Sequence, residues 1–180
     1  MVNTQITKWS NLQRNELKEE VLHAIMGQGM GGSTQYLLFT DTYFEKIGDE
    51  KTKNEVINII KEFAEDLGAL PSSRAIYLLG ELPILDKKET ILKIIGLLNP
   101  MVEDILKGEG VPDSSAYVFD YICELNKLIG RLNLFEGKLF LEKQTAYLQY
   151  PMPEPITKEY YFYHLCARSA AESLRLLQNI

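Results

Sequence analysis

Apolar residues recur at helical spacing along almost the whole chain. The clearest case is residues 56–67, where they follow the i, i+3, i+4, i+7 rule of a helix with one buried face. Gly68 stands directly after this run, at a position where helices commonly end. The apolar residues of this segment are Val56, Ile59, Ile60, Phe63, Ala64 and Leu67.

Similar stripes predict further helices before and after this segment. A capping box at Ser10–Gln13 is expected to open the first of them, and Pro100 and Gly137 are expected to kink or end two later ones. The other stripes run over 17–25, 75–82, 91–106, 116–132 and 161–177. The sequence therefore predicts an all-α protein.

For two segments the sequence does not decide between a helix and a strand. Residues 36–40 form a short apolar run that fits either, although the longer run through Ile47 favours a helix. In 138–150, Leu139 and Leu141 alternate as in a strand, whereas 141–148 also fits a helix. A short β-hairpin within 138–150 is the alternative there.

A spacing of 41 residues recurs in the chain. Pro71, Pro112 and Pro153 are each 41 residues apart, and each precedes a predicted helix; Tyr36-Leu37-Leu38 returns as Tyr77-Leu78-Leu79 at the same displacement. This spacing indicates repeated helical hairpins. We predict a single domain, 1–180, with hairpins at about 10–47, 51–82, 86–130 and 138–180.

The period and the helix–turn–helix units resemble HEAT-type repeats. Arg74 and Asp120 do not align as the HEAT consensus would require, so the resemblance is one of architecture. It implies a right-handed α-solenoid whose exposed faces bind another macromolecule, and it implies no catalytic residues.

The charge of the chain narrows the class of partner. The formal net charge is −6, with the acidic excess before residue 125. An acidic surface repels phosphate backbones, which disfavours nucleic acid and favours a basic protein. We expect a cytoplasmic protein without a membrane partner, because no stretch is long and apolar enough to span a bilayer and the start of the chain does not resemble a signal peptide.

Acidic residues of the first two hairpins form the candidate docking surface. A hairpin stack would bring them together, and charge of one sign speeds association with a partner of the other. The alternative is an ordinary solvated face. The residues are Glu45, Asp49, Glu50, Glu62, Glu65 and Asp66.

Aromatic residues gather near the end of the chain. Four consecutive aromatics, 160–163, cannot all point to one side of a helix. Packing on a neighbouring hairpin explains them, and Tyr160 and Tyr163 are also candidate interface anchors. If they were a self-association surface, the chain would be a structural subunit of an assembly; its oligomeric state is open.

Candidate chemistry is sparse. Gly27–Gly32 spells GxGxxG, but a helix precedes it instead of the strand that dinucleotide binding requires. Glu20 and His23 form one ExxH pair, whereas a di-iron site needs two. Cys123 and Cys166 lack metal-ligand spacing and are expected to be buried thiols. No cofactor or metal is expected.

The sequence thus favours a non-enzymatic protein-binding module. By analogy of size and acidity, it is similar to small bacterial immunity or antitoxin proteins, which would occlude a basic toxin domain with an acidic face. The main alternative is a helical domain that binds or transforms a small molecule with the Gly27–Gly32 loop and His23.

Overall fold

The computed structural model describes residues 9–26, 49–67, 71–82, 84–106, 116–149 and 158–178, together with Pro151 and Glu154. Side chains are described from Val118 in the helix that begins at Ala116, and from Tyr163 in the last helix. Within these ranges the regular structure is entirely helical, so the all-α prediction is confirmed. The α-helices are α1 (Arg14–Met26), α3 (Glu50–Glu65), α4 (Pro71–Glu81), α5 (Lys87–Leu106), α6 (Ala116–Arg131), α7 (Lys138–Thr145) and α8 (Lys158–Gln178). The 3₁₀ turns are η1 (Trp9–Asn11), η3 (Phe135–Gly137) and η4 (Ala146–Gln149).

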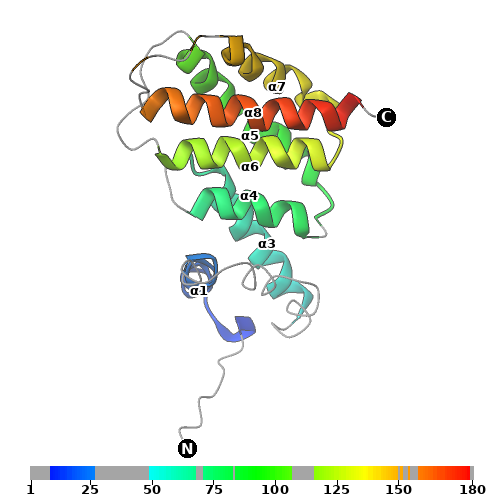
Figure 1. Ribbon diagram of the computed structural model, residues 1–180. Helices are drawn as coiled ribbons and strands as arrows, with labels where there is room; N and C mark the ends of the chain where they lie inside the picture. The colour runs from blue at the N-terminus through cyan, green and yellow to red at the C-terminus, as the bar shows by residue number, and fades with distance from the viewer. Residues whose placement is uncertain are drawn as a thin grey trace, which may run out of the picture.

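Three helices, α4, α6 and α8, lie side by side in one layer (Figure 1). A second row is formed by α3, α5 and α7: α3 contacts α4 and α5, α5 contacts α7, and α7 contacts α8. α1 packs against α3 and α4 at the end of the molecule remote from α8.

The helices of the first layer run in the same direction. Cys123 of α6 meets Cys166 of α8, and Gly130 lies against Ser173, so the contacting residues keep a constant displacement of 43. α3 contacts α4, α7 contacts α8, and α6 packs mainly on α4 and α8. The division into four hairpins stays a prediction, as does the right-handed HEAT-like stack.

The helix predicted from residues 56–67 is confirmed as α3. Val56, Ile59, Ile60, Phe63 and Ala64 are buried, as their spacing requires. The helix ends at Glu65 rather than at Gly68, because Asp66 is extended (φ −85°, ψ 94°) and its carbonyl accepts a hydrogen bond from the Ser72 hydroxyl.

Other predicted helix boundaries need correction. η1 covers Ser10 and Asn11 of the predicted capping box, and α1 begins at Arg14; the Glu16 carboxylate accepts the backbone N–H of Gln13 at 2.9 Å. α5 continues through Pro100 to Leu106. α6 ends at Arg131, before Gly137, because Asn133 adopts a left-handed conformation with φ 51°.

The strand alternative for 138–150 is wrong over 138–149, which form α7 and η4. Phe140, Leu141 and Gln144 are the buried positions, and their spacing is helical. The other ambiguous segment, 36–40, lies outside the described residues.

A buried amide pair joins the last three helices. Asn126 of α6 donates to the Gln144 side-chain oxygen at 2.8 Å, and Gln144 of α7 donates in return at 3.0 Å. The same two amide groups also donate to the carbonyls of Cys166 in α8 (3.2 Å) and Phe140 in α7 (3.1 Å). Because both amides are satisfied, they fix the register of α6, α7 and α8 without leaving a polar group unpaired.

Candidate functional site

The predicted acidic residues at the start of α3 have local roles. Asp49 is the N-cap: its carboxylate accepts the backbone N–H of Thr52 at 2.8 Å and the Thr52 hydroxyl at 2.9 Å. These hydrogen bonds lower the pKa of Asp49 below its usual range. Glu50 is exposed in the first turn, 4.0 Å from the ammonium group of Lys53. Glu45 lies outside the described residues.

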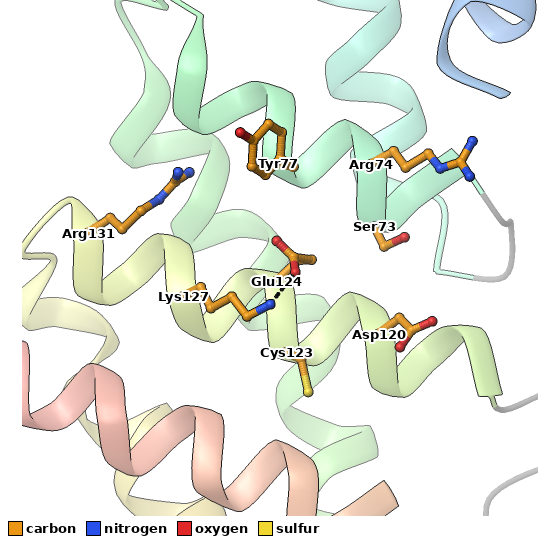
Figure 2. A pocket seen from close by; sticks show the side chains of 8 residues that line it. All are labelled: Ser73, Arg74, Tyr77, Asp120, Cys123, Glu124, Lys127 and Arg131. Carbon is orange, nitrogen blue, oxygen red and sulfur yellow. Dashed lines mark hydrogen bonds and ion pairs between the residues drawn. The ribbon is translucent and has the colours of Figure 1, made fainter. Parts of the chain in front are cut away.

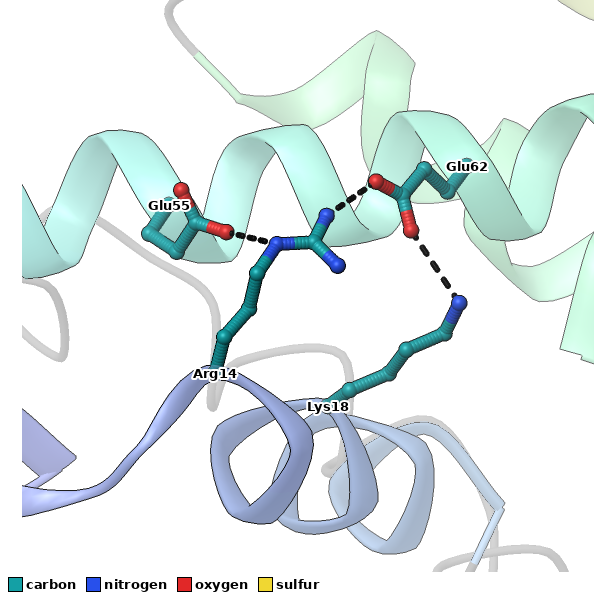
Figure 3. A network of polar contacts seen from close by, with 4 residues as sticks. All are labelled: Arg14, Lys18, Glu55 and Glu62. Atoms are coloured by element: carbon teal, nitrogen blue, oxygen red, sulfur yellow. Dashed lines mark hydrogen bonds and ion pairs between the residues drawn. The ribbon is translucent and has the colours of Figure 1, made fainter.

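Glu62, in the middle of α3, binds two basic residues of α1 (Figure 3). Arg14 and Lys18 both donate to its carboxylate, Lys18 at 3.1 Å, and Arg14 also binds Glu55 at 2.6 Å. Partial burial alone would raise the pKa of Glu62, but the hydrogen bonds from Lys18 and Arg14 lower it overall. This carboxylate is therefore occupied within the chain.

Glu65 and Asp66 at the end of α3 are also engaged. Glu65 binds the ammonium group of Lys93 in α5 at 2.6 Å, and the Asp66 carbonyl receives the Ser72 hydroxyl. Glu62 thus pairs with α1 and Glu65 with α5. Among the predicted docking residues, Asp49 therefore caps α3, and Glu62 and Glu65 form ion pairs with neighbouring helices.

Of the two aromatic candidates, Tyr160 and Tyr163, only Tyr163 has a described side chain. Tyr163 packs edge-to-face on Phe119 and Tyr147, with ring centroids 5.3 and 5.1 Å apart, so its ring contacts α6 and η4. For Tyr163, packing within the chain accounts for its position.

The residues of the small-molecule alternative are only partly described. His23 and Glu20 are both exposed on α1, and within the ranges given above no three metal-binding side chains come together. The Gly27–Gly32 loop lies outside the described residues. The helix expected before it is present as α1.

A groove lies between α4 and α6 (Figure 2). Its volume is about 460 Å³, and it is open to solvent. Because α4 and α6 are parallel, side chains at helical spacing on each helix face each other along its length. The lining residues are Ser73, Arg74, Tyr77, Asp120, Cys123, Glu124, Lys127 and Arg131.

The charges at one end of the groove are neutralised. Arg131 binds Glu81 at 2.8 Å and lies 5.4 Å from the centre of the Tyr77 ring, a cation–π contact. Lys127 binds Glu124 at 2.5 Å. The Arg131–Glu81 pair joins α6 to α4, whereas the Lys127–Glu124 pair lies within α6. Each basic residue here is therefore paired with a carboxylate.

The opposite end presents polar groups without side-chain partners among the described residues. Ser73 and Arg74 lie there in the first turn of α4, and Asp120 lies near the start of α6 (Figure 2). One guanidinium nitrogen of Arg74 donates to the carbonyls of Ile25 and Met26 at the end of α1, at 2.9 and 3.2 Å. Asp120 makes no hydrogen bond or ion pair with the described residues. A ligand can reach these groups from the groove.

The environment of Asp120 is unfavourable for its charged form. Partial desolvation raises the pKa of this carboxyl group, the nearby Glu124 carboxylate raises it further, and Lys127 offsets only part of the effect. A positive group placed against Asp120 would relieve this penalty. The groove thus contains a carboxylate suited to a cationic ligand group.

The sequence contains a signal for this site. Asp120, Cys123, Lys127 and Arg131 follow helical spacing on one face of α6, a polar stripe beside the buried stripe. What the sequence does not give is the pairing of α6 with α4, which brings Ser73 and Arg74 to the other wall.

Comparisons with protein-family models, curated protein sequences and solved structures found no significant match. Across the described ranges, no helix combines the length and apolar character needed to cross a bilayer.

Proposed function

We propose that this chain is a non-enzymatic protein-binding module that holds a segment of its partner in the groove between α4 and α6. The observation that carries the proposal is the groove itself, about 460 Å³, with the Asp120 carboxylate unpaired among the described residues. Asp120 is exposed to solvent on the groove wall, so a positively charged group of a ligand can reach its carboxylate and pair with it.

The partner segment that fits this site carries a basic side chain. A lysine or arginine placed on Asp120 would supply the missing positive charge, and the Ser73 hydroxyl can accept a hydrogen bond beside it. The Arg74 donors that bind no described residue can bind a backbone carbonyl or a carboxylate of the same segment. A basic partner also agrees with the net charge of −6.

The rigid packing around the groove supports this assignment. α6 is held by α4 on one side and by α8 on the other, so the spacing of the groove walls is set before a partner arrives. A preformed site loses less conformational freedom on binding than a mobile one.

An immunity or antitoxin function is one instance of this class and stays a prediction. In its original form it uses the acidic residues of α3, whereas Glu62 and Glu65 already bind Arg14, Lys18 and Lys93. Breaking those pairs to bind a toxin would lower the gain in binding energy. In the groove, Asp120 could bind a basic domain without first breaking an ion pair to a described residue.

The test is quantitative affinity capture from native lysate at low salt with four baits. Wild-type protein and Glu19→Lys should recover the same stoichiometric partner, because Glu19 is exposed on α1 and is not among the residues that line the groove. Asp120→Lys should lose it, although it changes the net charge by the same amount. The fourth bait, with Glu62, Glu65 and Asp66 changed to Lys, tests the acidic face of α3.

Two outcomes would overturn the proposal. One is recovery of no stoichiometric partner by the wild-type bait. The other is a partner that Asp120→Lys retains and the triple α3 variant loses, which would return the interface to the acidic face.

A further inference from the structure

Cys123 and Cys166 form a close thiol pair between α6 and α8. Their sulfur atoms are 3.6 Å apart, although the residues are 43 positions apart in the chain. Both are free thiols, and they are the two cysteines of the chain. Their proximity was not expected from the sequence, since their spacing matches no disulfide or metal pattern.

The backbone around this pair is held from both helices. The Ser169 hydroxyl of α8 donates to the Cys123 carbonyl at 3.1 Å, and the Asn126 amide of α6 donates to the Cys166 carbonyl at 3.2 Å. Each cysteine is therefore anchored by the helix that carries the other. The sulfur contact follows from a fixed register between the two helices and does not depend on one mobile side chain.

We propose that Cys123 and Cys166 are a redox-active dithiol, in which a hydroperoxide oxidises Cys123 and Cys166 then closes a disulfide between α6 and α8. The inference is independent of the partner proposed for the groove, since it concerns a covalent change within the chain. The chemistry needs an accessible attacking thiol beside a second thiol that resolves the intermediate.

The two cysteines differ in the way these roles require. Cys123 is partly exposed and lines the groove, whereas Cys166 is buried and its thiol also lies 3.6 Å from the Phe119 carbonyl. A hydrogen bond from Cys166 lowers the pKa of Cys123, and Lys127 adds to the effect. The pKa of Cys166 is raised by its interaction with the Cys123 thiolate and by burial. Cys123 is the attacking thiol.

The reaction is balanced with a hydroperoxide as the oxidant. The Cys123 thiolate attacks the terminal peroxide oxygen; a sulfur–oxygen bond forms, the oxygen–oxygen bond breaks, and the leaving oxygen takes up a proton. The Cys166 sulfur, losing its proton, then attacks the sulfenic acid, and the hydroxyl group leaves as water. Two thiols and one hydroperoxide thus give one disulfide, one water and one alcohol, or a second water from hydrogen peroxide.

Closing the disulfide requires the two sulfur atoms to move together. A disulfide needs the sulfurs at about 2 Å, so they must approach by roughly 1.5 Å through side-chain rotation and a slight shift of the helices. A small oxidant is favoured because Cys123 is only partly exposed. Since Cys123 lies in the groove, this site couples oxidation to the surface proposed to bind the partner.

The first test uses the reduced, full-length chain and hydrogen peroxide. The expected product is a monomer that has lost two hydrogen atoms and whose two thiols resist alkylation, measured by intact mass spectrometry. Oxygen additions without hydrogen loss, or a disulfide-linked dimer, would overturn the proposal.

Two variants separate the roles. In Cys166→Ser, Cys123 should accumulate a sulfenic acid that dimedone traps; in Cys123→Ser, Cys166 should react at least about tenfold more slowly than Cys123 does. Equal rates, or faster reaction of Cys166, would contradict the assignment.

A third measurement does not depend on the variants folding. Phenylarsine oxide should bridge the two thiols of the reduced wild-type chain as a single adduct without intermolecular products. Failure to form this adduct in folded protein would show that the sulfurs are not adjacent and accessible, and would reject the dithiol.

Discussion

The polar contacts at two helix joints of this protein differ in burial, while apolar residues pack at both. α1 is tied to α3 by exposed ion pairs, in which Arg14 and Lys18 share Glu62 and Arg14 also binds Glu55 (Figure 3). α6 is tied to α7 and α8 by the buried pair of Asn126 and Gln144.

The exposed ion pairs of α1 and the buried amide pair of α6 should differ in how strongly they fix the helices in position. Exposed ion pairs contribute about 0–1 kcal/mol and are screened by salt, whereas a buried amide that loses its partner costs about 1–3 kcal/mol. The α6–α8 joint, which carries one wall of the groove and both cysteines, should therefore be rigid. The α1–α3 joint should respond to salt and pH.

The largest expected effect comes from Asn126→Ala. The substitution leaves the Gln144 amide buried and partly unpaired and also creates a small cavity, so the free energy of unfolding should fall by about 2–3 kcal/mol. Urea denaturation measures it. Asn58→Ala, at an exposed position of α3, is the control and should stay within about 0.5 kcal/mol of wild type. An equal loss of unfolding free energy in Asn126→Ala and Asn58→Ala would show that the buried amide pair has no special role in stability.

A pair of glycine substitutions tests how closely α6 and α8 approach. A Cβ on Gly130 would lie 2.9 Å from the Ser173 Cβ and 3.0 Å from its Cα, whereas one on Gly96 of α5 meets nothing within 4 Å. Gly130→Ala should therefore destabilise the fold by about 1–2 kcal/mol despite the better helix propensity of alanine. Gly96→Ala should stabilise it by about 0.5–1 kcal/mol. Thermal unfolding of both variants measures these changes in stability. If Gly130→Ala were more stable than wild type, α6 and α8 would be packed less closely than the structure shows.

A smaller effect is expected at the α1–α3 joint. Glu62→Gln should lower the free energy of unfolding by less than about 1 kcal/mol at low salt, and the loss should vanish near 1 M NaCl. Glu19→Gln, at an exposed position of α1, serves as the reference. A large loss that persists at high salt would mean that this joint is as rigid as the other.

The smallest effect is the pH response of the same carboxylate. Because its pKa is lower in the folded state than in the unfolded chain, Glu62 stabilises the fold fully above the unfolded value, and this stabilisation is lost as the pH falls through the folded value. NMR titration of the Glu62 carboxyl group should give a midpoint below that of an ordinary glutamate. Lys18→Met should raise that midpoint; a value that does not move would reject the contact.

The sequence predicted the positions of the helices better than it predicted which helices pack against each other. Periodicity identified α3, α6 and α8 because each buries a stripe at helical spacing. It left 138–150 open, since Leu139 and Leu141 alternate as in a strand; the alternation does not reflect burial, because Leu139 is exposed and Leu141 is buried. Boundaries shifted where a tertiary contact intervened, as at Asp66.

The candidate site was harder to predict for a physical reason. Net charge and local acidity pointed to Glu62 and Glu65, but the bases that neutralise them lie on other helices and cannot be matched without the packing. Asp120 is conspicuous only after α4 is placed beside α6. The closeness of Cys123 and Cys166 likewise depends on the parallel register of α6 and α8.

Native-state hydrogen exchange, resolved by helix at low and high salt, tests the central contrast most directly. Amides of α6 and α8 around Asn126 and Cys166 should exchange only through global unfolding at both salt concentrations. Amides of α1 should exchange at a lower free energy that falls further at high salt. Exchange of α6 and α8 at or below the free energy of α1 would contradict a rigid layer that carries the groove and the dithiol.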